Sequence, residues 1–183
     1  MAAVLGVAAA DVEAACRTAR TQTGQEVVPA NFNGPGQIVI AGHAEAVEAA
    51  MDILKARGVR KMMKLPVSAP FHSPLMEPAR VRMEPVLQAL VWSVPSCPLV
   101  NNVDAVPVMD PSLLLDGLVR QIPGAVRWEA LTARLLDEGV TTFYELGPGK
   151  VLSGLVKRQA KEAGLEVAAF AIGAPDDFKA LAR

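Results

Sequence analysis

The sequence predicts an α/β protein in which a small ferredoxin-like subdomain over residues 1–66 precedes a second α/β part over residues 67–183. The first observation is an element order of βαββαβ in the amino-terminal third, which is the order of the ferredoxin-like fold. The second is a change of pattern after residue 66, where helical segments dominate. The third is a strand, a glycine-rich turn, a helix and a strand near the carboxyl end, as in an α/β layer.

The elements of the subdomain follow from composition and spacing. An alanine-rich segment favours a helix that Gly24 ends, and Gly34-Pro35-Gly36 is a hairpin-type turn between two apolar runs. Apolar residues at spacings of three and four predict a second helix, which Gly58 ends. The expected elements are a strand at 2–7, a helix at 9–21, strands at 27–33 and 37–42, a helix at 43–57 and a strand at 61–68.

The second part is expected to contain more helix than strand. Its last stretch runs from a strand through Gly147-Pro148-Gly149 into a helix and a final strand, and we interpret it as part of a sheet whose other strands lie outside this sequence. The expected elements are a helix at 75–90, a strand at 99–103, helices at 112–121 and 127–138, a strand at 141–146, a helix at 150–163 and a strand at 166–172.

Composition excludes several classes of protein. With 51% hydrophobic and 20% charged residues, the chain is expected to fold rather than remain disordered. A net charge of -1 provides no field that would attract nucleic acid or an anionic membrane, and no stretch approaches the roughly 20 apolar residues of a membrane span. Two cysteines without metal-ligand spacing and an amino terminus without signal-peptide features predict a cytoplasmic protein without a metal site.

His72 is the first candidate for chemistry. It lies in VSAPFHSPLM, just after a predicted strand and between Pro70 and Pro74, so its ring is expected on a rigid, irregular loop. A histidine can act as a general base near neutral pH. Taken alone, a structural histidine with an ordinary hydrogen bond explains the motif better.

The motif is one of a series. VSAPFHSPLM is followed by PLVNNVDAVPV, LVRQIPGAVRWEALTARL and FYELGPGKVLSGLVKR, and ANFNGPGQIVIAGH precedes it. From residue 1 to about residue 160 this series resembles the malonyl-CoA:acyl carrier protein transacylases of fatty acid synthesis. The resemblance implies that residues 67–183 are the carboxyl-terminal part of an α/β-hydrolase-like acyltransferase core.

The resemblance also implies a mechanism. In that family a serine in a G-x-S-x-G elbow attacks the malonyl thioester and forms an ester before transfer to the phosphopantetheine thiol of the carrier protein. His72 matches the family's base, and Gln121 matches the residue whose main-chain carbonyl orients it. No serine of the chain lies in G-x-S-x-G, so we expect a truncated polypeptide that is inactive alone. A non-catalytic interpretation of Gln121 is an exposed amide at a helix end.

Four further residues match positions that border the family's substrate cleft. Asn31, Asn33 and Gln37 could hydrogen-bond a thioester or pantetheine, although capping of a turn beside glycine and proline explains the asparagines equally well. Phe71 matches a bulky residue that could shorten the acyl pocket. The resemblance implies malonyl-CoA and acyl carrier protein as partners, no cofactor of the protein's own, and a monomer when full length.

Two other functions stay open at this point. One is an acyltransferase domain of a polyketide synthase. The other is a non-catalytic binding module that uses a basic cluster to hold a carrier protein or a nucleotide; its members are Arg57, Arg60, Lys61 and Lys64. Gly147-Pro148-Gly149-Lys150 is only a fragment of the GxxxxGK[ST] phosphate loop, and we expect a structural turn there.

Overall fold

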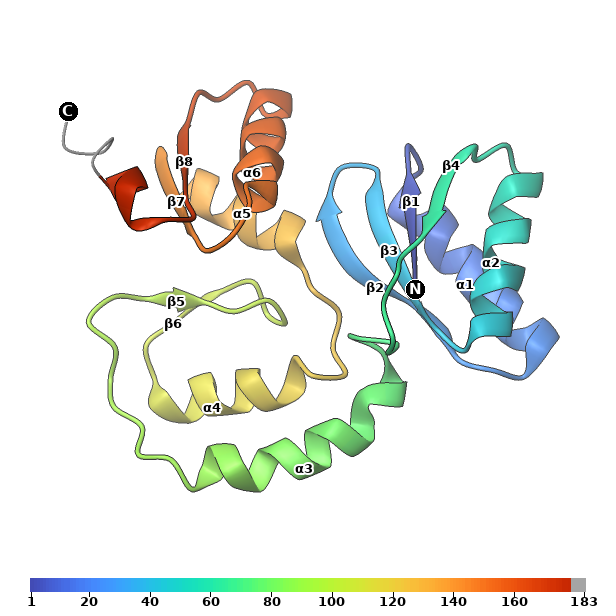
Figure 1. The fold of residues 1–183 in the computed structure, drawn as a ribbon, viewed down its shortest axis with the longest axis horizontal. Helices are drawn as coiled ribbons and strands as arrows, with labels where there is room; N and C mark the ends of the chain where they lie inside the picture. The colour runs from blue at the N-terminus through green and yellow to red at the C-terminus, as the bar shows by residue number, and fades with distance from the viewer. Residues whose placement is uncertain (179–183) are drawn as a thin grey trace. The chain divides into compact units, whose positions relative to one another are not determined.

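A computed structural model describes residues 1–178 and divides the chain into two compact units, Met1–Leu131 and a second that begins at Thr132 (Figure 1). The boundary between the units falls within α5 (Trp128–Asp137). The domain boundary predicted after residue 66 lies inside the first unit and stays a prediction. The structure is of mixed α/β type, as predicted.

The first unit begins with a four-stranded sheet and two helices. Neighbouring strands follow the order β2-β3-β1-β4, and every neighbouring pair is antiparallel. The helices α1 and α2 pack against each other beside the sheet, as Figure 1 shows. The elements are β1 (Ala2–Leu5), α1 (Ala9–Thr23), β2 (Val27–Gly34), β3 (Gln37–Gly42), α2 (Ala44–Ala56) and β4 (Lys61–Lys64).

Small aliphatic side chains form the core between this sheet and its helices. Alanines on the inner faces of α1 and α2 let the two helices approach closely, and Leu54 fills the remaining space without any solvent exposure. Gly24 ends α1 in a left-handed conformation with φ of 66°. The cluster consists of Ala2, Val4, Val12, Ala15, Cys16, Ala19, Val27, Ile38, Ile40, Ala46, Val47, Ala50 and Leu54.

The rest of the first unit is built from helices and short strands. A parallel bridge between Asn31 and Val126 links β2 to the segment that follows α4. At the start of α4, the Asp110 side chain accepts a hydrogen bond from the Ser112 backbone N–H at 2.7 Å. The elements are η1 (Pro74–Met76), α3 (Glu77–Gln88), β5 (Leu99–Val100), β6 (Pro107–Val108), α4 (Pro111–Arg120) and the start of α5.

The second unit is a β-α-β arrangement. β7 (Thr142–Leu146) and β8 (Ala168–Ile172) pair in parallel, and α6 (Val151–Glu162) connects them and packs on both strands (Figure 1). The rings of Tyr144 and Phe170 stack with their centroids 5.5 Å apart. A short turn of 3-10 helix, η2 (Pro175–Asp177), follows β8.

Several predicted elements are shorter or differently divided in the structure. The strand predicted at 61–68 ends at Lys64, because Pro66 lacks a backbone N–H and cannot continue the ladder. The strand predicted at 99–103 ends at Val100, where the Asn101 side chain turns the chain by accepting the N–H groups of two following residues. The strand β6 was not predicted.

The helix predicted at 75–90 is also divided, into η1 and α3. None of the helices formed by residues 1–178 combines the length and the apolar composition of a transmembrane segment. The same part of the chain contains no group of three or more histidine, cysteine, aspartate or glutamate side chains that could hold a metal ion.

Candidate active site

A tight turn between Pro70 and Pro74 presents His72. The backbone of His72 has φ of 58°, a left-handed conformation that non-glycine residues rarely adopt. Such a residue costs about 1–3 kcal/mol and persists only where its surroundings fix it. Ser73 supplies part of that fixation, since its fully buried hydroxyl donates a hydrogen bond to the Pro70 carbonyl at 2.6 Å. This role of Ser73 was not predicted from the sequence.

The imidazole of His72 is held by two main-chain carbonyl groups. Its Nδ1 atom lies 3.1 Å from the carbonyl oxygen of Gln121 and 3.1 Å from that of Gly124. A carbonyl oxygen can only accept, so a proton on Nδ1 is the arrangement that makes these contacts hydrogen bonds. In the neutral ring this leaves the lone pair on Nε2, the atom that could take a proton from a substrate or a nucleophile.

Both carbonyls lie at the carboxyl-terminal end of α4. Gln121 follows the last helical residue, and the Gly124 N–H donates to the Arg120 carbonyl at 3.1 Å. Carbonyl groups at this end of a helix have no donor within the helix, which leaves them available to the imidazole. The helix dipole is also negative here, and it attracts the positive charge that the ring acquires on taking up a proton.

Gly124 fits this position because of its missing side chain. A Cβ atom on Gly124 would lie 2.6 Å from the Arg120 carbonyl oxygen and 2.9 Å from a methyl group of Val103. Any other residue would therefore displace the backbone that contacts His72. Gly124 was not predicted from the sequence, although the Pro123-Gly124 pair just after a predicted helix was an available signal.

Residues 121–126 (the His72-binding segment) include the two carbonyls and also form hydrogen bonds with β2. Val126 donates its N–H to the Ala30 carbonyl and accepts the Phe32 N–H, both at 2.8 Å. These bonds bring the half-buried Asn31 to the neighbourhood of the His72-binding segment. Of the predicted site residues, His72 and Gln121 are in direct contact, and Asn31 is connected to them through this backbone.

The other predicted site residues are placed by their own elements. Asn33 is half-buried near the end of β2, and Gln37 begins β3 opposite Gly34, across the hairpin. Phe71 is 42% exposed directly before His72. Their roles at a substrate stay predictions, as do the roles of His72, Gln121 and Asn31.

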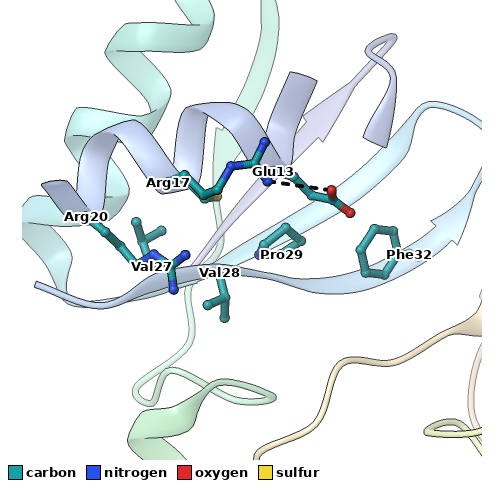
Figure 2. Close-up of a pocket in the computed structure, with 8 residues that line it drawn as sticks. Glu13, Arg17, Arg20, Val27, Val28, Pro29 and Phe32 are labelled. Carbon is teal, nitrogen blue, oxygen red and sulfur yellow. Dashed lines mark ion pairs between the residues drawn. The ribbon is translucent and has the colours of Figure 1, made fainter. Parts of the chain in front are cut away.

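A separate hollow of about 260 Å³ lies between α1 and β2 (Figure 2). Both arginines that line it have a carboxylate partner, because Arg17 pairs with Glu13 at 3.9 Å and Arg20 pairs with Glu26 at 3.6 Å. Burial raises the pKa of the Cys16 thiol, one of the lining groups, to about 12, so the reactive thiolate is not populated near neutral pH. The charged side chains of the hollow are therefore paired, and its thiol is not a nucleophile near neutral pH.

The first turn of α6, which follows the Gly147-Pro148-Gly149 turn, binds a carboxylate of the protein itself. The carboxylate of Glu145 accepts the N–H groups of Leu152 at 3.0 Å and Ser153 at 2.7 Å. The hydrogen bond from the Ser153 backbone holds the pKa of Glu145 below its usual value. Because this internal carboxylate occupies the first turn of α6, the geometry favours the structural turn over a phosphate loop.

Known proteins are similar to this chain over most of its length. A profile of the acyl transferase domain family matches residues 1–176. Malonyl CoA-acyl carrier protein transacylase of Escherichia coli is 44% identical over 158 residues, and that of Bacillus subtilis is 43% identical over 160 residues. Each match covers 86% of this chain and 50% of the relative, so the chain spans about half the length of these relatives.

Solved structures agree with the sequence comparison. A crystal structure of malonyl-CoA:acyl carrier protein transacylase from Xanthomonas oryzae superposes with a TM-score of 0.90 at 43% identity, covering 98% of this chain and 55% of that one. A chain in the solved structure of a type II polyketide synthase acyl-carrier protein in complex with its malonyl-transacylase also matches. Its TM-score is 0.89 at 36% identity, over 97% of this chain and 56% of that one.

Proposed function

Because this chain belongs to the acyl transferase domain family, we propose that it forms the base-carrying half of a malonyl-CoA:acyl carrier protein transacylase. The observation that carries the proposal is the contact of His72 Nδ1 with the carbonyls of Gln121 and Gly124, which leaves Nε2 to accept a proton. The identities of 44% and 43% with relatives named for this activity support the choice of malonyl-CoA and acyl carrier protein as substrates.

In the proposed reaction His72 moves one proton in each half. Nε2 takes the proton of a serine hydroxyl as the serine oxygen attacks the thioester carbon, and it returns that proton to the coenzyme A sulfur as the C–S bond breaks. The second half reverses these steps with the phosphopantetheine thiol of the carrier protein. The two carbonyls at the end of α4 hold the ring and stabilise its transient positive charge.

The serine must come from outside these 183 residues, since no serine of the chain lies in a G-x-S-x-G context. We therefore expect the isolated chain to transfer no malonyl group, because a base without its nucleophile lacks the acting unit. An assay of the purified polypeptide with malonyl-CoA and carrier protein checks this. Malonyl transfer above the rate without protein would show that another group of the chain acts as nucleophile.

We also propose substrate contacts for four residues. The link between β2 and the Gln121–Val126 segment supports a place for Asn31 beside the base, and Asn33 follows on the same strand. Exposure of Phe71 next to His72 supports a role in limiting the length of the acyl pocket. Gln37 is included as the residue that faces the end of β2 across the hairpin.

The finer description of the fold is likewise a proposal. The element order βαββαβ and the antiparallel strand order β2-β3-β1-β4 support a ferredoxin-like subdomain over residues 1–66. We assign residues 67–183 to the carboxyl-terminal part of an α/β-hydrolase-like core, which the parallel pairing of β7 with β8 supports. We further propose a cytoplasmic protein that needs no cofactor and acts as a monomer when full length.

The test of the proposed function is a chimera that joins the amino-terminal half of the Escherichia coli relative to this chain. His72→Ala should lower the single-turnover rate of enzyme malonylation by about 10²–10⁴-fold, the contribution of a positioned acid–base group. Thermal unfolding should change little, because a loop side chain contributes little core packing. His43→Ala serves as the matched control, since His43 is the chain's other histidine and lies at the start of α2.

Two outcomes of this test would contradict the proposal. A nearly normal malonylation rate in His72→Ala would remove the role of base. Equal losses of rate and of thermal stability would favour a structural histidine instead.

A second candidate is supply of malonyl groups to a polyketide synthase carrier protein. The match to the solved structure of a malonyl-transacylase in complex with a type II polyketide synthase acyl-carrier protein favours it. Comparing kcat/KM of the chimera for a fatty acid carrier and for a type II polyketide carrier separates the two. A higher value for the polyketide carrier would favour this second candidate.

A further inference from the structure

The ion pair between Asp104 and Arg120 lies at the helix end that holds His72. Arg120 is the last residue of α4, and its guanidinium donates to both carboxylate oxygens of Asp104, at 2.9 and 2.7 Å. Such a bidentate contact fixes direction as well as distance. The Arg120 guanidinium also holds the pKa of Asp104 below its usual value.

Asp104 is itself fixed within its loop. The buried Asn101 side chain donates to Asp104 at 3.1 Å and accepts the Val103 and Asp104 N–H groups at 3.1 and 2.7 Å. Ala105 then adopts φ of 56°, and its N–H donates to the Asn101 carbonyl at 3.1 Å. A non-glycine residue in this conformation indicates a loop that its own contacts fix.

The same loop contacts the chain on the far side of the His72-binding segment. The Asn102 carbonyl accepts the Arg127 N–H at 2.9 Å. The loop over residues 101–105 therefore holds residue 120 through a side chain and residue 127 through the backbone. Gln121 and Gly124, whose carbonyls contact His72, lie between these two attachments.

We propose that Asp104 and Arg120 are positioning residues for His72, which fix the Gln121 and Gly124 carbonyls that hold its Nδ1–H. The pair acts through the backbone of residues 121–124 and touches neither the imidazole nor a reacting group. The inference rests on the proposed function only in treating His72 as the base. Its structural content, that the ion pair sets the tautomer and the orientation of the ring, is independent of that role.

The test uses the imidazole ¹⁵N spectrum of the 183-residue chain, which contains two histidines. His72 should be the Nδ1–H tautomer, because it faces carbonyls. His43 should be the Nε2–H tautomer, because its Nδ1 accepts the Glu26 backbone N–H at 3.1 Å. The two rings should therefore give opposite patterns of protonated and unprotonated nitrogen, and His43 serves as an internal reference for folding.

Asp104→Asn and Arg120→Gln should each move the His72 nitrogen shifts toward a mixture of tautomers and leave those of His43 unchanged. Asp116→Asn is the matched control. Arg120 also donates to Asp116 at 2.6 Å, but Asp116 lies within α4, so this ion pair joins two residues of the same helix rather than the helix to the loop over residues 101–105. Asp116→Asn should therefore leave both histidines unchanged.

Kinetics in the chimera provide a second readout. Asp104→Asn should lower kcat about 10-fold with little change in KM, which is less than the roughly 10²-fold that a misplacement of about 1 Å can cost. Arg120→Lys keeps the charge but loses the bidentate geometry, so its kcat should stay below that of the unsubstituted chimera.

Several results distinguish a positioning role of Asp104 and Arg120 from a purely structural role. Unchanged His72 shifts in folded Asp104→Asn and Arg120→Gln would overturn the proposal, as would an equal effect of Asp116→Asn. If either variant unfolds, seen as a loss of the His43 pattern, Arg120→Lys decides in its place, and unchanged His72 shifts there would overturn the proposal. A normal rate in His72→Ala would instead contradict the proposed function and leave the positioning result standing.

Discussion

Residues 2–64 and residues 70–127 of the first unit are stabilised in different ways. In the former, a continuous core of alanine, valine, isoleucine and leucine side chains fills the space between the sheet and two helices. In the latter, α3 has no buried residue, and the turn and loop around His72 are fixed by hydrogen bonds to backbone atoms and by one bidentate ion pair. Apolar packing therefore shapes the scaffold, and backbone carbonyls shape the candidate site.

The largest expected effect concerns the scaffold. Leu54→Ala should lower the free energy of unfolding by about 2–5 kcal/mol, because Leu54 is fully buried and its removal leaves a cavity. Met63→Ala is the matched control, since Met63 is 64% exposed on β4 and should change stability by less than about 0.5 kcal/mol. Urea unfolding of the unsubstituted chain and of the two variants measures both changes in the free energy of unfolding. A similar loss in the two variants would contradict the picture of a single core behind the sheet.

A smaller effect is expected at the end of α4. Gly124→Ala should destabilise the chain by about 1–3 kcal/mol and disturb the His72 tautomer, because the new Cβ would meet the Arg120 carbonyl oxygen at 2.6 Å. Gln121→Ala should disturb neither, since the contact to His72 comes from its main-chain carbonyl. Thermal unfolding and the imidazole ¹⁵N spectrum check the pair. A larger tautomer change in Gln121→Ala than in Gly124→Ala would contradict the backbone account.

The same contrast explains how far the sequence predicted the structure. The helices predicted at 9–21 and 43–57 lie at 9–23 and 44–56, and the strands on either side of the Gly34-Pro35-Gly36 turn were also predicted, because alanine-rich composition, apolar spacing and glycine breaks are local signals. The strand at 61–68 was predicted too long, since its apolar run continues through Pro66 while the ladder does not. Side chains that pack in a core recur at regular spacings in the sequence, whereas contacts to backbone atoms produce no such pattern.

The candidate site was predicted only in part for this reason. His72 and Gln121 came from resemblance to a family, and the spacing of 49 residues between them carries no local signal of contact. Ser73, Gly124 and the Asp104–Arg120 pair were missed, because their importance depends on which carbonyl or carboxylate the fold brings to them. A left-handed φ at His72 and at Ala105 likewise cannot be inferred from a histidine or an alanine in a sequence.

The smallest expected effect concerns the basic cluster at residues 57–64, on the scaffold rather than at the candidate site. Two of its members already have contacts within the protein, since Lys64 pairs with Glu48 and Arg57 donates to the Asp11 carbonyl at 3.5 Å. Arg60 and Lys61 are exposed, so they are the better candidates for meeting an acidic carrier protein. Reversing both charges in the chimera should raise the KM for the carrier protein about five-fold and leave kcat unchanged. A change in KM of about five-fold corresponds to the loss of two exposed charge contacts of about 0.5 kcal/mol each.

The salt dependence of KM decides whether this effect is electrostatic. The difference between the chimera and its Arg60→Glu/Lys61→Glu variant should shrink as ionic strength rises, because exposed charges are screened over about 8–10 Å at 0.1–0.15 M salt. Lys64→Glu alone should have a smaller effect, since Lys64 is paired with Glu48. An unchanged KM in the double variant would remove the docking role, and a fall in kcat with the His72 tautomer altered would instead indicate that the cluster acts on the site through the fold.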